Sequence, residues 1–552
     1  MKKIYSYIAM VLFLLGTSCS EDYLEVDHYD IIVPDIMFSS ESGIIQGLNG
    51  LYDMFYPNKE GNDIQVNWNF KPQIALSNYP ALDCQASGWD NEFTRHDWRA
   101  DKDMFEVGWK QCYQAIDRVN RFLVNLKQAD VSVFSDGENT RNMIIAEARA
   151  IRAFFYSYLA QNFGRLPMLK EGDTYVNTPN KARAETVDVT WDFIIEDLKY
   201  AVDKLDWIPW NGQYGRITKG MAKAYLAQAY MYKKNFELAK TQLNDIIESG
   251  IYELEECFGT VHTEDHWWGK ESVWEVPFPH FDNMNWGAEG QTDAVWWVSY
   301  LTANPDYGGW GSLFISYEFV NSFEPGDKRK VYSVVESGET NPYTGETLSS
   351  NETITSENMP NNSCLKMWKR KTGSDGRVYY SQSAVWKRYS AILLDYAECL
   401  FETVGEGADS HGMTGWDYIN EVRNRAWGNL EVAIQPQYPN EPVPLNDHVV
   451  QVPDAKTFYS TDPHCSSYSA STWKVALTME RRHEFLAEYS FWYDLTRTGM
   501  AEEFIAKEYP KGSSFTNRQF DYQSYHELYP IPYLEIITNK LIGPENQNPG
   551  YY

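Results

Sequence analysis

Residues 221–250, MAKAYLAQAYMYKKNFELAKTQLNDIIESG, have the pattern of two amphipathic helices joined near Lys234–Asn235. The spacing of a tetratricopeptide repeat is matched at five positions: Leu226, Ala227, Tyr230, Ala239 and Leu243. Small residues at these positions let paired helices approach closely, and a tyrosine fills the gap between them. Any amphipathic hairpin is the alternative interpretation, but the five matches favour a repeat. Such hairpins bury their apolar faces only by stacking on neighbours, so the stretch predicts a helical scaffold.

Other stretches show the same helical periodicity. In residues 143–164 apolar side chains recur at three- and four-residue steps, and Gly164 and Pro167 then predict the end of the helix. A second helix is expected over 190–207, and a further pair over 388–402 and 416–427. We therefore predict a mostly α fold with helical repeats at about 140–250 and 385–500.

Between these repeats, at about 255–380, the helical periodicity fades. Glycine, asparagine, proline and tryptophan become frequent there, and stretches such as YTGETLSSNETITSENMPNNS are typical of long loops. We interpret this region as a loop-rich, Trp-rich insertion carried by a single domain over 46–552. Loops held by a rigid scaffold are where binding residues usually concentrate.

The first eighteen residues have the pattern of a bacterial lipoprotein signal. Two lysines precede a short apolar run, small residues follow, and Cys19 then stands at the expected site of cleavage and lipidation. Gly16 occupies the place where the strict pattern prefers leucine, so an ordinary secreted protein with a chance cysteine is the alternative. A lipid on Cys19 would anchor the mature chain to a membrane without spanning it, and 19–45 would form the anchor and an extended segment.

Composition limits the classes of ligand. The formal net charge is −29, and loss of Lys2 and Lys3 with the signal lowers it to about −31. Nucleic-acid binding is disfavoured because phosphate contacts need clustered lysines and arginines. No second apolar run approaches eighteen residues, which excludes a helical membrane protein. The six other cysteines form no C-x-x-C pair, which argues against zinc, and Cys399 is expected to be a buried thiol.

An ordered series of motifs resembles one known family over the whole chain. These are CSEDYLE, GLNGLYDMFY, AEARAIRAFFYSYLAQNFGRLPML, GRITKGMAKAYLAQAYMYKKNFELA, ESVWEVPF, RYSAILLDYAECLFE, INEVRNRA, MERRHEFLAEYSFWYDLTRTG and LYPIPYLEIITN…QNPGY. Each motif is weak alone, but their order and completeness resemble the SusD-like (RagB/SusD) nutrient-uptake lipoproteins.

The resemblance implies a mostly helical SusD-like fold built around tetratricopeptide-like pairs and held by lipid at the outer surface of the outer membrane. Ser20, Glu21 and Asp22 are similar to the acidic tag that sends some lipoproteins to the cell surface. Members of the family bind glycans or other nutrients, cover a SusC-like TonB-dependent transporter, and are not enzymes. No cofactor is expected, although structural calcium stays open because no single spacing defines its site.

Aromatic residues gather in polar, glycine-rich segments. A sugar presents an apolar face that an aromatic ring buries, while neighbouring polar groups fix its hydroxyls. We favour a cluster over 281–311 as ligand contacts, supported by a cluster over 66–98; the predicted contacts are Trp286, Trp296, Trp297, Tyr307, Trp310, Trp89, Trp98 and Trp68. A third candidate is HTEDHWWGK, with Trp267 and Trp268.

Two other groups of polar residues have plainer explanations. The charges of MERRHE and YDLTRTG, which include Glu480 and Arg497, fall at helical spacing and are expected to form structural ion pairs. His262 and His266 lie four apart, but the segment has the pattern of a loop, so we predict no metal site there.

Three classes of function remain open from the sequence. The first is a surface lipoprotein that captures a glycan, or a non-glycan nutrient, for its transporter. An exported glycoside hydrolase is the second, and it needs two carboxylates ~5–9.5 Å apart, which no pattern in the sequence pairs. The third is an adhesive protein that binds peptide on its repeat surface.

Overall fold

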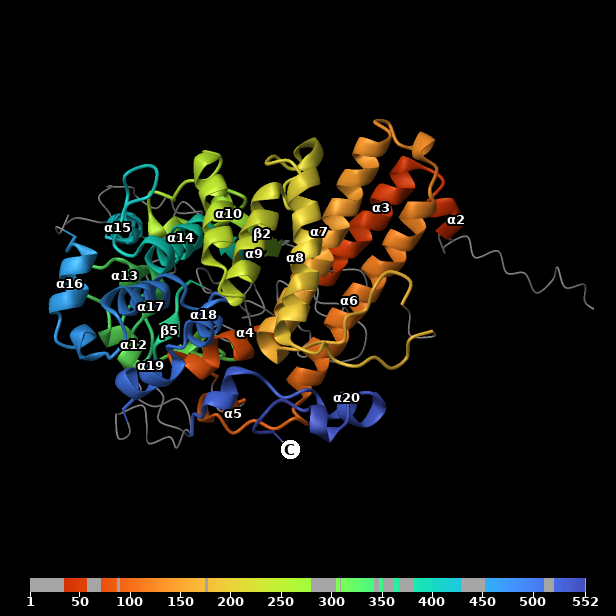
Figure 1. The fold of residues 1–552 in the computed structure, drawn as a ribbon. Helices are drawn as coiled ribbons and strands as arrows, with labels where there is room; N and C mark the ends of the chain where they lie inside the picture. The colour runs from red at the N-terminus through yellow and green to blue at the C-terminus, as the bar shows by residue number, and fades with distance from the viewer. Residues whose placement is uncertain are drawn as a thin grey trace, which may run out of the picture.

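The structure is a computed structural model that describes residues 34–56, 71–86, 90–173, 177–278, 304–307, 309–341, 347–350, 361–366, 382–427, 452–510 and 521–551. Its helices are α2 Pro34–Met37, α3 Glu41–Tyr52, α4 Lys71–Asn78, α5 Glu92–Arg95, α6 Asp103–Gln128, α7 Glu138–Phe163, α8 Val187–Lys204, α9 Lys219–Tyr232, α10 Phe236–Glu248, α12 Tyr317–Asn321, α13 Arg329–Ser333, α14 Tyr389–Val404, α15 Gly415–Ala426, α16 Ala455–Thr461, α17 Thr472–Glu484, α18 Phe491–Thr498, α19 Ala501–Glu508 and α20 Tyr533–Thr538. The fold is therefore mostly α, as predicted (Figure 1).

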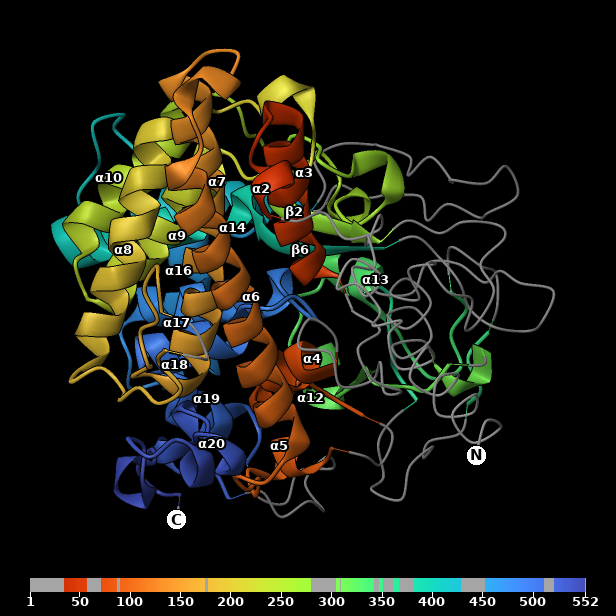
Figure 2. The ribbon, with the colours of Figure 1, turned by 90° about the vertical axis from the view of Figure 1, so that its right-hand side faces the viewer.

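Helices α6 to α10, α14 and α15 pack on one another in chain order (Figures 1 and 2). Local chemistry sets their ends: the Thr186, Thr218 and Asn235 side chains each accept a hydrogen bond from a backbone amide of the first turn. Helix α7 stops at Gly164, whose positive φ of 72° suits glycine. The helices predicted over 143–164, 190–207, 221–250, 388–402 and 416–427 are all confirmed.

Short strands connect the region at about 255–380 to the helical scaffold. Strand β2, Ser272–Phe278, pairs antiparallel with β6, Gln382–Arg388. A second sheet has the order β1–β3–β5–β4 and joins distant segments: Cys84–Gln85, Phe314–Ile315, Ser363–Cys364 and Val334–Val335. The region predicted as a loop-rich insertion thus also supplies strands and the short helices α12 and α13.

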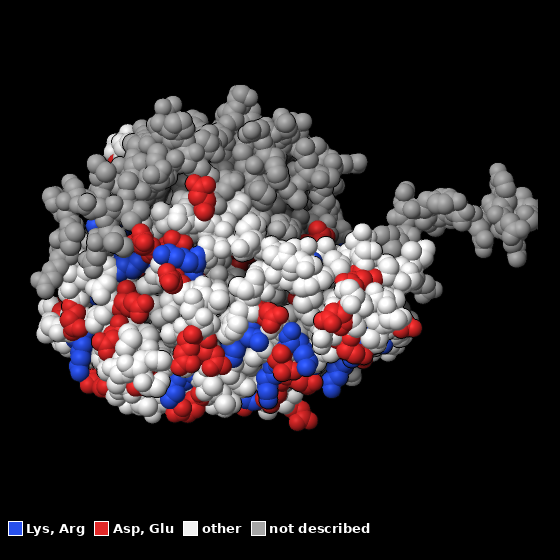
Figure 3. All heavy atoms as spheres, turned by 90° about the horizontal axis from the view of Figure 1, so that it is seen from above, with Lys and Arg blue, Asp and Glu red and all other residues white. Residues whose placement is uncertain are grey.

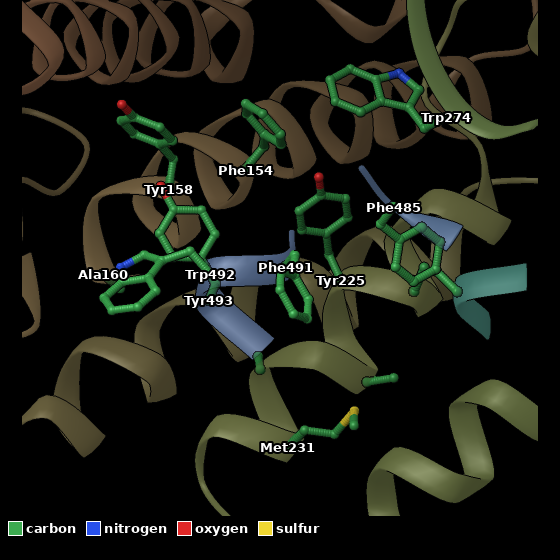
Figure 4. Packing of buried hydrophobic residues seen from close by; sticks show 14 of the residues in the cluster. Phe154, Tyr158, Ala160, Tyr225, Met231, Trp274, Phe485, Phe491, Trp492 and Tyr493 are labelled. Carbon is green, nitrogen blue, oxygen red and sulfur yellow. The ribbon is translucent and has the colours of Figure 1, made fainter. Parts of the chain in front are cut away.

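One hydrophobic core joins these parts. Trp274 of β2 packs on Phe154 of α7, with ring centroids 5.0 Å apart. Figure 4 shows rings from α7, α9, α18 and β2 converging, among them Phe154, Tyr225, Trp274 and Trp492. Because aromatic side chains bury large areas, this cluster fixes β2 against the repeats.

Ionised side chains are buried around α17, where the sequence predicted structural ion pairs. Arg482 contacts Asp83 at 2.7 Å and Glu508 at 2.6 Å, and Arg481 contacts Glu398 at 2.8 Å. Each of these side chains is less than one-tenth exposed. The remaining members of this network, which we call the α17 network, are Glu271, Glu324, Asp327, Arg329, Lys366, Arg388, Asp395, Arg423, Arg425, Glu480, Glu484, Glu488 and Arg497.

The six cysteines beyond Cys19 are all buried, free thiols. Cys399 is fully buried in α14, as predicted. Within the described residues, no helix is both long and apolar enough to cross a membrane. On the face shown in Figure 3, acidic and basic side chains are interspersed among the described residues.

The α17 network makes stability depend on pH. The guanidiniums of Arg497 and Arg481 outweigh burial and hold the pKa of Glu398 at about 2, below its ordinary 4.5. Its contribution is therefore present above about pH 4.5 and is lost as the pH falls toward about 2. We expect Glu398→Gln to lower the free energy of unfolding at pH 7 by about 3–5 kcal/mol, and by less at pH 3.

Urea unfolding followed by circular dichroism at both pH values tests this expectation. Glu196→Gln is the matched control, because the Glu196 side chain is 74% exposed in its pair with Arg149. Equal losses for Glu398→Gln at pH 7 and pH 3 would contradict the account.

Candidate functional site

Two exposed aromatic rings lie side by side at one edge of the scaffold. Tyr214 is 66% exposed and Trp268 is 38% exposed. Their ring centroids are 6.3 Å apart and their planes differ by 29°. Buried aromatic rings are ordinary, but two neighbouring rings that face solvent present an exposed apolar surface. We call this pair the aromatic shelf.

A pocket of about 410 Å³ lies beside the shelf. It is formed by the end of α3, the segment before α9 and strand β2. The pocket is lined by Asn49, Tyr52, Phe55, Tyr56, Gln213, Tyr214, Gly215, Arg216, Trp268, Glu275, Val276 and Pro277. This volume falls in the range of small-molecule sites, and the lining combines aromatic rings with amide and charged groups.

The backbone of Trp268 is held in an unusual conformation. Its φ is +52°, in the left-handed region that a bulky residue rarely adopts. The Trp268 amide donates a hydrogen bond of 2.5 Å to Oε1 of Glu275, which lies beside a register shift in β2. Glu275 is buried, and burial raises the pKa of its carboxyl. Backbone strain of this kind persists only where its surroundings determine it, so Glu275 fixes the position of the indole.

Gly215 lies between Tyr214 and Arg216 in a backbone conformation that favours glycine. Its φ is +90°, and a Cβ added there would lie 3.4 Å from Cζ2 of Trp268, an ordinary contact distance. The positive φ, rather than a lack of space beside the indole, therefore requires glycine at this position.

The polar floor of the pocket is organised by Arg216, which is 7% exposed. Its guanidinium donates to Glu147 at 3.0 Å, to Oδ1 of Asn49 at 2.7 Å and to Oε1 of Gln213 at 2.6 Å. The Tyr52 hydroxyl donates to Glu147 at 2.7 Å. Because the amide oxygens of Asn49 and Gln213 accept from Arg216, their NH₂ groups are the parts that a ligand oxygen would meet.

Electrostatics keep this floor in place. Burial raises the pKa of the Glu147 carboxyl, while the adjacent Arg216 opposes that rise. Burial also raises the pKa of Tyr52 well above its ordinary value, with Glu147 adding to the effect. Tyr52 therefore keeps its proton and donates to the carboxylate.

The structure corrects one predicted ligand contact. Trp98 is 4% exposed, and its Nε1 donates to the Tyr551 hydroxyl at 2.7 Å. Its ring packs against His526 and Tyr529, with centroids 4.8 and 5.2 Å apart. Trp98 is thus a core residue that ties the C-terminal segment to the scaffold.

The other predicted contacts are placed differently. Trp310 is half-buried. Tyr307 ends the short 3₁₀ turn Pro305–Tyr307, and its side chain lies outside the described residues. Five predicted contacts also lie outside the described residues: Trp68, Trp89, Trp286, Trp296 and Trp297.

Trp268 belongs to one of the aromatic clusters predicted from the sequence, whereas Tyr214 belongs to none of them. The segment WNGQYGR carries the available signal, because it sets two aromatic residues among glycine, asparagine and glutamine between helices. Arg216 of the same segment lies with its guanidinium carbon 5.3 Å from the Trp210 ring. Tyr214 and Trp268 are 54 positions apart, and no pattern in the sequence pairs them.

The two histidines near Trp268 have structural partners. His262 lies with Nε2 3.3 Å from Glu488, and His266 lies with Nδ1 3.1 Å from Glu255. Among the described residues, no group of three or more histidine, cysteine or acidic side chains has the arrangement of a metal site.

Similar proteins match the whole chain or a part of it. SusD-like protein P2 of Formosa agariphila is 24% identical over 571 residues and spans 100% of both chains. A SusD-like protein of Bacteroides ovatus is 25% identical over 263 residues, which span 44% of this chain and 43% of that protein.

Solved structures share the fold. Surface glycan-binding protein A from Bacteroides fluxus aligns with a TM-score of 0.67 at 21% identity, covering 93% of this chain and 100% of that one. A laminarin-binding SusD-like protein aligns with a TM-score of 0.65 at 21% identity, covering 93% of this chain and 100% of that one. Surface glycan-binding protein A from Bacteroides thetaiotaomicron, in complex with laminarihexaose, aligns with a TM-score of 0.66 at 18% identity. The alignment covers 92% of this chain and 100% of that one.

Family matches divide the chain into two parts. Residues 22–231 match a family described as starch-binding associating with outer membrane. Residues 270–551, just over half of the 552, match the SusD family. With the helical architecture and the structural neighbours in agreement, this chain belongs to the SusD family.

Proposed function

We propose that this protein is a cell-surface lipoprotein that binds a neutral oligosaccharide and delivers it to a SusC-like TonB-dependent transporter. The observation that carries the proposal is the aromatic shelf of Tyr214 and Trp268, which faces solvent beside a polar pocket. Flat rings bury the apolar face of a sugar, and the amides of Asn49 and Gln213 suit its hydroxyls.

We infer the class of ligand from the net charge of the chain and from the structural neighbours. A formal net charge of −29 disfavours strongly anionic polysaccharides. Two structural neighbours are described as glycan-binding, and another as laminarin-binding. A neutral glycan such as laminarin is therefore the first ligand to test.

We propose that the ligand also meets aromatic residues beyond the shelf. These are the remaining contacts predicted from sequence: Trp68, Trp89, Trp286, Trp296, Trp297, Tyr307 and Trp310. Several weak contacts along one chain of sugars raise the overall affinity, as linked sites do generally.

Binding without hydrolysis is the proposed activity. A glycoside hydrolase needs two carboxyl groups that reach the glycosidic bond. Among the described residues that line the pocket, Glu275 is the one carboxylate, and it is engaged by the Trp268 amide. No cofactor is assigned to this activity.

Loss of either ring should weaken glycan binding. We expect Trp268→Ala and Tyr214→Ala each to weaken binding about tenfold, because each removes a stacking surface. Affinity electrophoresis of the mature protein in gels with neutral and acidic polysaccharides, laminarin included, measures the effect. Reducing-end assays on the same samples should detect no cleavage.

Tyr533→Ala is the matched control, because Tyr533 is 56% exposed on α20, outside the pocket. It should migrate like the wild type in the presence of glycan. Unchanged retardation of both shelf variants would refute the assignment of the shelf, and release of sugar would refute the assignment as a non-enzyme.

Gly215→Ala tests whether the backbone positions the shelf. Gly172 is the control, since its φ of +91° matches that of Gly215 and a Cβ there meets nothing within 4 Å. Both alanine variants should lose about 1–3 kcal/mol of stability from the strained φ. Only Gly215→Ala should also weaken glycan binding and change tryptophan fluorescence. Equal binding by the two variants would contradict the role given to Gly215.

Cys19→Ala tests the lipid anchor. Without the acylated cysteine the protein should leave the detergent phase in Triton X-114 partitioning of whole-cell extracts. Cys84→Ala, which alters a buried thiol, is the control and should partition like the wild type. Retention of Cys19→Ala in the detergent phase would contradict lipid anchoring at this residue.

A further inference from the structure

Two exposed amide side chains lie on the floor of the pocket beside the shelf. They are Asn49 of α3 and Gln213, which precedes α9. An amide has two N–H donors at one end and an acceptor oxygen at the other, so its orientation decides which of these a ligand meets. The contacts of Arg216 determine that orientation for both residues.

Arg216 holds both amides by their oxygens. Its Nη2 donates to Oδ1 of Asn49 at 2.7 Å, and its Nε donates to Oε1 of Gln213 at 2.6 Å. A guanidinium has donors and no acceptor, so a reversed amide would set its N–H groups against those of Arg216. The third nitrogen, Nη1, donates to the buried Glu147 at 3.0 Å, which fixes the guanidinium itself. Each amide therefore keeps its oxygen on Arg216 and presents its NH₂ group to the pocket.

The other polar side chains of this floor offer a ligand few acceptors. Among the described lining residues the one carboxylate is Glu275, whose Oε1 accepts from the Trp268 amide and whose Oε2 is buried. The Tyr52 hydroxyl donates to Glu147 and accepts from the Ile217 amide at 2.9 Å. A ligand at the floor thus meets mainly N–H donors, and an oxygen that accepts without having to donate matches them best.

We propose that this pocket recognises the carbonyl oxygen of an acetamido group, so that its preferred ligand is a glycan built of N-acetylhexosamine units. The inference rests on the proposed function and adds the sugar substituent that the floor distinguishes. An acetamido carbonyl accepts two hydrogen bonds and carries no proton, whereas a hydroxyl has a proton that also needs a partner. The acetamido methyl group suits the apolar part of the lining, which includes Tyr56, Val276 and Pro277.

A carboxylate also accepts hydrogen bonds, but the charges around the floor disfavour it. Arg216 is the one basic side chain among the described lining residues, and its charge is paired with Glu147. Glu275 adds a second carboxyl to the surroundings, and the whole chain carries a formal net charge of −29. An uncharged acceptor therefore matches the floor better than an anionic one.

N-acetylated chitotriose and cellotriose form a matched pair of probes. Both are β-linked trimers of glucopyranose, and they differ only in the substituent beside the anomeric carbon, which is an acetamido group in one and a hydroxyl in the other. Isothermal titration of the mature protein should give a dissociation constant for chitotriose about tenfold below that for cellotriose. Trp268→Ala should weaken the binding of both, because stacking on the shelf does not depend on this substituent.

Asn49→Asp and Gln213→Glu test the two amides. Each change keeps an oxygen for Arg216, so the melting temperature should stay close to that of the wild type, but it replaces the NH₂ donors with an acceptor. The preference for chitotriose should shrink in each variant and disappear when the two are combined. Asn142→Asp is the matched control and should keep the preference, because Oδ1 of Asn142 accepts from the Tyr200 hydroxyl at 3.1 Å, outside the pocket.

Equal affinity of the wild type for the two trimers, or tighter binding of cellotriose, would overturn the inference and leave the proposed function standing. Binding of laminarin without chitotriose, tighter binding of a uronic acid trimer than of chitotriose, or a full preference in the combined variant would do the same. Failure of both trimers and of laminarin to bind would instead refute the proposed function. Because the two trimers are compared on the unaltered protein, the result does not depend on the folding of any variant.

Discussion

The buried ion pairs around helix α17 hold together parts of the chain that lie far apart in sequence. Arg482 reaches Asp83 near the N-terminal side, Glu480 reaches Arg329 of the central region, and Glu484 reaches Arg388 of β6. A buried ion pair adds little net stability over an apolar pair, but an unpaired buried charge is very costly. The network therefore acts mainly against other arrangements of these segments, because any displacement would leave a charge without its partner.

Strand β2 connects the α17 network to the aromatic shelf. Glu271, just before β2, contacts Arg388 at 2.7 Å and Arg425 at 2.5 Å, and both carboxyl oxygens are used. Four residues later Glu275 accepts the hydrogen bond that holds Trp268 in its left-handed conformation. The position of a solvent-facing ring is thus set by charges in the core, and a preorganised ring costs less to order when ligand arrives.

Much of the scaffold could be predicted because its signals are local. Periodicity placed α7 to α10, α14 and α15, and helical spacing predicted the Asp494–Arg497 ion pair. The spacing did not predict that Glu480 pairs with Arg329, because these two residues are distant in sequence. The site was harder to predict from the sequence, because it depends on contacts between residues that are distant in sequence. Trp98 is buried because Tyr551, 453 positions later, accepts its N–H. Tyr214 lies beside Trp268 in a structure in which β2 packs on α9, and no local sequence pattern indicates that contact.

The Tyr214–Trp268 shelf is the sugar-binding surface that we propose. The most direct test is a crystal structure of the mature protein with the oligosaccharide that retards it most in affinity electrophoresis, laminarihexaose being the first choice. We expect a pyranose ring stacked on Trp268 or Tyr214, with a hydroxyl within hydrogen-bonding distance of Asn49 or Gln213. An oligosaccharide bound elsewhere on the protein, with the shelf free, would contradict it.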